Sequence, residues 1–206
     1  MKKTLISSLA LFAVLVFSFP AHSRKYEKIF NLASEPKYYQ YVEYKSSYTS
    51  EHILLLTVID KRPEEEKVYK KGVQYFYDEI WVNPPAEMLE EIFLKELRFT
   101  NMFRAVDVDE RDPSLILKIE LISLIGNYGK GRMAMGVLKT HAVLKSAKDN
   151  SILMDKDYEE ISQSVVGRFG NAYRPMIKHI GIVFHNVVEN TLMDLENTLR
   201  RENHEA

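Results

Sequence analysis

The chain has 206 residues, of which 46% are hydrophobic and 28% charged, and its formal net charge at pH 7 is −1. This near-neutral balance excludes the basic character expected of a nucleic-acid-binding protein and of a polybasic membrane patch. The absence of cysteine excludes a disulfide framework, a thiol nucleophile, thiolate metal ligands and a lipidated cysteine.

The N-terminus has the three parts of an export signal. Two lysines precede an apolar run over residues 5–19, and Ala21-His22-Ser23 supplies a small-x-small cleavage site. The run is shorter than the roughly 20 residues needed to span a bilayer, so we predict a cleaved signal peptide over residues 1–23. N-terminal sequencing of the exported protein is expected to find Arg24 first, and an intact Met1 would contradict this.

Cleavage would leave a mature chain of ordinary single-domain size. Without Lys2 and Lys3, the 28 basic residues become 26 against 29 acidic ones, a net charge of −3. We predict a periplasmic protein of a bacterial envelope, or one peripheral at the outer membrane, without a lipid anchor because the chain has no cysteine.

Residues 24–50 form a tyrosine-rich lead-in with six tyrosines. We predict an extended segment that is ordered only where its rings dock on the domain, because tyrosine commonly packs with a buried ring and a wet hydroxyl. Residues 52–60 are a short run of branched apolar side chains, which is typical of a buried strand. Residues 68–77 have strand-like composition, and the charged run 61–71 predicts a solvated connection.

A helix is predicted to begin at Asn83-Pro84-Pro85, because proline is tolerated in a first helical turn. From Met88 to Leu97 the apolar residues, Phe93 among them, recur at helical spacing and form one stripe. The pattern ends near Thr100. This helix should therefore bury one face.

The second half of the chain predicts an antiparallel meander of three strands. Residues 114–125, 133–146 and 152–161 have strand-like alternation, and turns are expected at 126–131 and 148–151. Leu138, Ala142 and Leu144 are expected to face inward and His141 outward.

The last element is a long helix over residues 175–200, which would span roughly 38 Å, with a frayed tail over 201–206. The predicted order is β-β-α-β-β-β-α. This order predicts an α+β domain over residues 51–200, with a mixed, largely antiparallel sheet and two helices packed on one face.

The search for reactive constellations predicts no catalytic, cofactor or metal site. The six histidines have no metal-ligand spacing. The glycines of residues 126–131 lie between two strands, whereas a phosphate loop precedes a helix. Asp155, Asp157 and Glu159 fall on one exposed strand face, so a solvated face is preferred, although a glycosidase-type carboxylate pair stays open from sequence.

The most distinctive passage is residues 75–85, Tyr-Phe-Tyr-Asp-Glu-Ile-Trp-Val-Asn-Pro-Pro, followed by Met88-Leu89, Leu97 and Phe103-Arg104-Ala105-Val106. It resembles the ABC-type transport auxiliary component family, which includes the small lipoprotein partner of the paraquat-inducible Mce-type lipid-transport system. The resemblance is strongest over residues 53–106.

That resemblance implies a non-enzymatic accessory component of an envelope ABC/Mce-type lipid-transport system, with an α/β fold. Its implied partners are a permease/ATPase complex or an Mce-domain protein. Members are usually lipid-anchored, and this chain departs from the pattern because it has no cysteine.

Five residues are candidates for partner binding: Tyr75, Tyr77, Trp81, Leu195 and Leu199. The tyrosines share one strand face, and aromatic residues are enriched in interfaces; Trp81 is alternatively a core lid. The two leucines end a helix that exceeds sheet strands of about 17–20 Å, which would leave them for a partner or a second copy.

Two other functions stay open from the sequence. One is a secreted hydrolase with an unrecognised carboxylate site, which convergent carboxylates in a cleft would favour. The other is a free-standing periplasmic lipid-binding protein, which a large apolar cavity between sheet and helices would favour.

Overall fold

The computed structural model of the chain describes residues 32–34, 38–67, 81, 83–128, 133–165 and 173–205. The predicted signal peptide and the predicted strand 68–77 lie outside these ranges. The part described contains a short 3-10 turn, five strands and three helices: η1 (Leu32–Ser34), β1 (Ile53–Asp60), α1 (Glu64–Lys67), α2 (Pro85–Thr100), β2 (Ala105–Asp107), β3 (Leu115–Tyr128), β4 (Met133–Ser146), β5 (Ile152–Val165) and α3 (Tyr173–Glu205).

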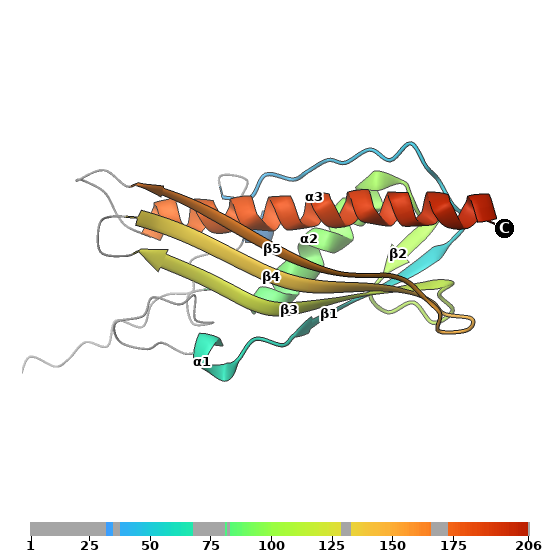
Figure 1. Ribbon diagram of the computed structural model, residues 1–206, viewed down its shortest axis with the longest axis horizontal. Coiled ribbons are helices and arrows are strands. Elements are labelled where there is room, and N and C mark those ends of the chain that lie inside the picture. Colours follow the sequence, from blue (N-terminus) through green and yellow to red (C-terminus); the bar gives the residue numbers. More distant parts are fainter. Residues whose placement is uncertain are drawn as a thin grey trace, which may run out of the picture.

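The strands form one sheet in the order β2-β1-β3-β4-β5 (Figure 1). β1 runs parallel to β2 and β3, while β3, β4 and β5 form an antiparallel meander. This confirms the predicted α+β class and its mixed, largely antiparallel sheet.

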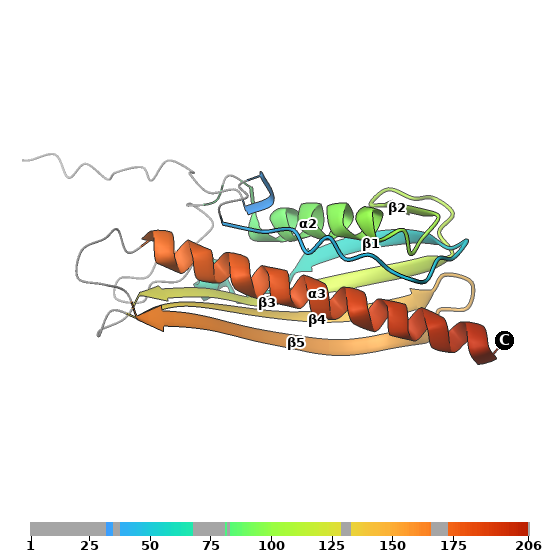
Figure 2. The ribbon, with the colours of Figure 1, turned by 90° about the horizontal axis from the view of Figure 1, so that it is seen from above.

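One face of the sheet carries both long helices, α2 over β1 and α3 over β4 and β5 (Figure 2). The side chains beneath them alternate along each strand and meet in register, as Leu56, Leu117 and Leu144 do. All three are buried. The predicted stripe of α2, from Met88 to Leu97, is buried against this face. No helix among the residues placed here is long and apolar enough to cross a membrane.

Several elements differ in extent from the prediction. β3 continues to Tyr128 because Gly126 pairs with Gly136 in the ladder, so the predicted turn over 126–131 starts too early. β5 continues four residues past the predicted end, to Val165. β2 was missed, since three residues are too few for a pattern of alternation. α3 continues to Glu205, past the predicted helix end at residue 200.

Residues 61–67 of the charged connection predicted over 61–71 are described, and among them Arg62 alone is buried. Arg62 is 3% exposed, and its guanidinium donates two hydrogen bonds to the Asp60 carboxylate, from Nε at 3.0 Å and from Nη2 at 2.7 Å. Burial raises the pKa of Asp60, but the hydrogen bonds and charge of Arg62 outweigh it, and the pKa lies below its usual value.

Residues 38–50 form an extended strap that contacts both α2 and α3. On α2, the buried Glu96 carboxylate accepts hydrogen bonds from the Tyr39 hydroxyl (3.1 Å) and from the backbone N–H groups of Val42 (2.5 Å) and Glu43 (3.1 Å). On α3, the buried Glu196 carboxylate accepts from the Tyr44 hydroxyl and the Ser47 hydroxyl. Two buried carboxylates therefore fasten the strap to the helices.

The strap and the sheet together explain why the end of α3 is not free. Leu195 is 0% and Leu199 is 1% exposed, so these two side chains are not available to a partner. Strands of 14 residues span roughly 45 Å, far more than the length assumed from average strands. Tyr44 and Tyr48 of the strap also pack against the core.

Gly181 lets the strap cross α3 at close range. A Cβ atom built on Gly181 would lie 1.6 Å from the backbone oxygen of Tyr38, a distance that requires the strap to move. Alanine favours a helix over glycine by about 1 kcal/mol, so propensity alone predicts that Gly181→Ala stabilises the protein.

We expect the opposite sign for Gly181→Ala. Overpacking a tight contact costs typically 1–3 kcal/mol, so the free energy of unfolding in urea should fall, and the strap should become sensitive to limited proteolysis. An unchanged or increased stability with a protected strap would show that the crossing is not tight.

The attachment of the strap at Glu196 should depend on pH. Burial raises the pKa of Glu196, but hydrogen bonds from Arg200, Tyr44 and Ser47 outweigh it and lower the pKa to about 2. Because the folded-state pKa lies below the ordinary value of 4.5, the carboxylate stabilises the fold above pH 4.5, and this stability is lost as the pH falls towards 2.

Glu196→Gln should therefore lower the free energy of unfolding by roughly 1.5–3 kcal/mol at pH 7. The difference from the wild type should shrink as the pH falls below about 4.5. Urea unfolding of both proteins between pH 7 and pH 3 measures it, and a difference that stays constant over this range would contradict the assignment.

Candidate interaction surface

The opposite face of the sheet is not covered by α2 or α3, and it divides into a polar and an apolar part. In the polar part, cross-strand ion pairs join Lys139 to Glu159 (2.9 Å) and His141 to Asp155 (2.8 Å). The hydrogen bond to Asp155 is the main cause that raises the pKa of His141, and burial opposes it.

These ion pairs involve two of the three carboxylates, Asp155, Asp157 and Glu159, for which the sequence left a glycosidase-type pair open. Asp155 and Glu159 each have a cationic or protonatable partner on β4, the neighbouring strand. They form a ladder of exposed pairs, each worth at most about 1 kcal/mol.

The apolar part lies at the other end of β4 and β5, and we call it the apolar end. Ile125, Val137 and Ile161 are partners in one row across three strands. Met133 pairs with Val165 further along. Ile161 is 57%, Val165 78% and Met133 39% exposed. With Met135, the apolar end has six residues: Ile125, Met133, Met135, Val137, Ile161 and Val165.

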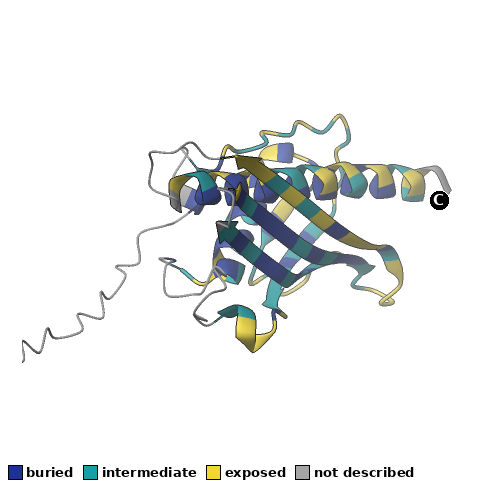
Figure 3. Cartoon of the chain, turned by 60° about the vertical axis from the view of Figure 1, so that its left-hand side comes forward, coloured by how far each residue is buried: buried dark blue, intermediate teal, exposed yellow. Residues whose placement is uncertain are grey.

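The described part of the sheet has two edge strands, β2 and β5, and a third edge where β3 extends beyond β1. These three edges are exposed to different degrees. β2, at one side, has only three residues, and short edge strands are a common protection against pairing with other chains. β5, at the other side, has 14 residues and most of its side chains exposed (Figure 3). The third edge belongs to β3, beyond the point where β1 ends.

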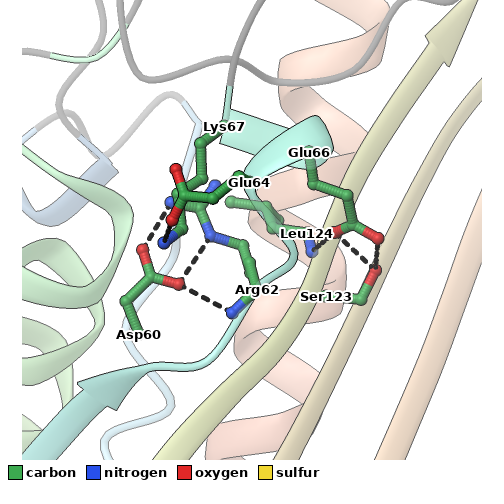
Figure 4. Close-up of polar contacts among 7 residues, drawn as sticks. All are labelled: Asp60, Arg62, Glu64, Glu66, Lys67, Ser123 and Leu124. Carbon is green, nitrogen blue, oxygen red and sulfur yellow. Dashed lines mark hydrogen bonds and ion pairs between the residues drawn. The ribbon is translucent and has the colours of Figure 1, made fainter.

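α1 caps this third edge. The last ladder contact between β1 and β3 is followed by a hydrogen bond from the Lys61 N–H to the Leu121 carbonyl (2.8 Å). Beyond a β-bulge between Leu121 and Ser123, the Glu66 carboxylate accepts hydrogen bonds from the Ser123 hydroxyl (3.0 Å) and the Leu124 N–H (3.3 Å) (Figure 4). Glu66 of the short helix thus satisfies one backbone N–H of β3, that of Leu124, which would otherwise be open to another strand.

A groove beside the strap bears on the lipid-binding alternative. It has a volume of about 230 Å³ and is lined by Tyr41, Glu43, Lys95, Glu96 and Phe99. Small-molecule sites typically have about 300–1,000 Å³, so this groove is too small for a lipid chain. The described space between sheet and helices is filled by buried side chains such as Phe93 and Phe184.

Of the five residues predicted to bind a partner, none lies on this surface within the described ranges. Tyr75 and Tyr77 lie outside those ranges. Trp81 is 0% exposed and fits the alternative of a core residue. Leu195 and Leu199 belong to the core, as shown above.

Sequence reasoning missed the apolar end, although a signal was present. Along Met133–Val137 every second residue, Met133, Met135 and Val137, is apolar and faces away from the helices, and the residues between them, Ala134 and Gly136, are buried. A strand that is apolar on both faces indicates either burial on both sides or a contact surface.

His179, predicted to have no metal-site role, is buried and hydrogen-bonded to Ser162 and Ser164. Across the residues with described positions, no group of three or more His, Asp or Glu side chains is placed to hold a metal ion.

Comparisons with known proteins identify the fold. No family model matches the chain, and no curated protein matches it. Among solved structures, protein XCC0632 from Xanthomonas campestris, described under the family model DUF330, is similar with a TM-score of 0.63 and 11% identity over 78% of this chain and 94% of that one. A second, described as an uncharacterized protein, has a TM-score of 0.52 and 13% identity over 74% of this chain and 96% of that one.

These findings correct the resemblance to the ABC-type transport auxiliary component family. No model of that or another family matches, and the two solved structures reported above carry the DUF330 designation or no functional description. Of the residues that suggested the family, Trp81 and the apolar stripe of α2 are buried in the core, and residues 75–80 lie outside the described ranges.

Proposed function

We propose that the protein is an exported, non-enzymatic component of a bacterial envelope that binds another envelope protein through the apolar end of the sheet face opposite α2 and α3. The sequence supports export through the predicted signal peptide of residues 1–23. The binding role rests on one structural observation, the exposure of Ile161, Val165 and Met133 together on one face.

Contiguous exposed apolar side chains with a polar surround are typical of protein–protein contact sites. The ion-paired ladder of Lys139, His141, Asp155 and Glu159 provides that surround on the same strands. Depletion of charge at the centre and polar groups at the rim are the usual composition of an interface. The narrower role in an ABC or Mce-type lipid-transport system depended on the family resemblance and falls with it.

Co-purification from detergent-solubilised envelopes tests this function. A tagged wild-type protein should retain a partner in a constant ratio, and Met133→Glu should lose most of it, because a charge buried within an apolar contact is desolvated without a counter-ion. Met193→Glu is the matched control: Met193 is 45% exposed, against 39% for Met133, and lies on α3.

Retention of the same partner by Met133→Glu, with the fold intact by circular dichroism, would reject the surface. Steady turnover of an ester, glycoside or phosphate substrate by the purified protein would reject the non-enzymatic assignment.

A further inference from the structure

The long edge of the sheet, β5, lacks the protections that the other edges have. It has 14 residues and no proline, and no described element pairs with it on its outer side. Charged residues, a common protection of edge strands, are confined to its middle, from Asp155 to Glu160. The last five residues, Ile161-Ser162-Gln163-Ser164-Val165, are uncharged.

We infer that β5 pairs antiparallel with β5 of a second copy of this chain, with Ile161 on the two-fold axis. This goes beyond the proposed function and does not depend on it, because it concerns the edge of the sheet and a partner of the same sequence.

The direction of the backbone groups fixes which residues can pair. The Ser146 N–H donates to the Ser151 carbonyl (3.0 Å), so even-numbered residues of β4 direct their N–H and C=O groups to β5. Their register partners on β5 are also even-numbered, as Gly136 with Ser162. The odd-numbered residues from Asp155 to Val165 therefore direct their backbone groups to the open edge, because these groups alternate in an antiparallel ladder.

Only registers that place odd residues opposite odd residues can then form hydrogen bonds. Charge excludes most of these. A carboxylate would lie directly opposite a carboxylate of the second copy, which is destabilising, if the two-fold axis passed through Asp157, Tyr158, Glu159 or Glu160. A two-fold axis at Ile161 pairs residues 157–165 of the two copies without placing carboxylates opposite each other. No other register pairs a longer segment without such an opposition.

In this register the central pair is apolar. Ile161 faces Ile161 of the second copy, Gln163 faces Glu159 and Val165 faces Asp157. The row of Ile125, Val137 and Ile161 would continue into the same row of the second copy, which doubles the apolar row on the face opposite α2 and α3. Among the described residues, α3 packs more on β4 than on β5, and no described element pairs with the outer side of β5.

The absence of cysteine from the chain permits a direct test by single-cysteine variants. Directly opposite residues in a hydrogen-bonded pair have Cα atoms about 5.5 Å apart, within disulfide range. Ile161→Cys should therefore form a disulfide-linked dimer under mild oxidation at micromolar concentration. In a Gln163→Cys dimer the two thiols, one from each copy, would lie four residues apart along the strands, about 14 Å. This variant should therefore not form a disulfide-linked dimer.

Ile152→Cys is the matched control, since Ile152 is also 57% exposed on the same strand and lies outside the paired segment. Wild-type protein should sediment as a dimer that dissociates on dilution, and Ile161→Lys should be monomeric at the same concentration. Linkage at residue 163 in place of 161, equal linkage at 152 and 161, or a wild type that stays monomeric would each overturn the inference. The loss of a heterologous partner through Met133→Glu concerns β4 and leaves this test unaffected.

Discussion

Replacing Phe93 by alanine is expected to lower the free energy of unfolding by about 3–5 kcal/mol, the usual range for emptying a buried aromatic site. Phe93 is 0% exposed and lies in the stripe of α2 that packs on β1. The cavity would open in the middle of the core cluster that joins α2 to the sheet, where neighbouring side chains are themselves fully buried and can collapse only partly.

Phe99→Ala provides the control on the same helix, because Phe99 is 42% exposed. Its loss should stay below about 1 kcal/mol, the scale of surface substitutions. Urea unfolding followed by circular dichroism measures both variants. Similar losses for the two, or a loss under about 1 kcal/mol for Phe93→Ala, would show that the stripe does not hold the helix on the sheet.

Glu96→Ala is expected to cost roughly 2–4 kcal/mol, because it removes the acceptor of several buried or half-buried donors at once. The Tyr39 hydroxyl and the N–H groups of Val42 and Glu43 would lose their partner. Burial, followed by the charge of Glu96, raises the pKa of Tyr39, so this hydroxyl stays protonated and remains a donor. Glu43 has a left-handed backbone with φ of 52°, and the bond to Glu96 helps to hold that conformation against its cost.

Glu96→Ala should loosen the strap before it affects the stability of the sheet. Amide hydrogen exchange of residues 38–50 should accelerate under native conditions, while the amides of β3 and β4 keep their protection. Glu87→Ala on the same helix is the control, since Glu87 is exposed and should change stability by less than about 1 kcal/mol. A strap that stays protected in Glu96→Ala would mean that ring packing, rather than the carboxylate, fastens it.

Patterns of side-chain spacing were enough to predict α2, β4 and the body of α3. Each has an apolar stripe or alternation of ten residues or more, and burial follows these patterns directly: the residues of α3 that recur at three- and four-residue spacing from Ile177 to Leu199 are buried. The end of α3 was misjudged because nothing in one segment tells how long the strands beneath it are, and β3 to β5 are far longer than average.

Contacts between distant segments escaped prediction for a related reason. Gly181 reads as a weak point of a helix, yet its role is set by Tyr38, which crosses it. Glu96 and Glu196 read as ordinary exposed positions on helices, yet both are buried because the strap folds over them. The apolar end is one surface only because the register of β3, β4 and β5 places its residues side by side. The sequence of a single strand does not determine that register.

The central claim, that the apolar end contacts another envelope protein, is tested most directly by a photo-reactive amino acid placed at Met133 in living cells. Met193, of similar exposure on α3, is the reference position. We predict a discrete cross-linked adduct with a second protein from position 133 and none of the same mass from position 193. No adduct at 133, or the same adducts at both positions, would contradict the claim.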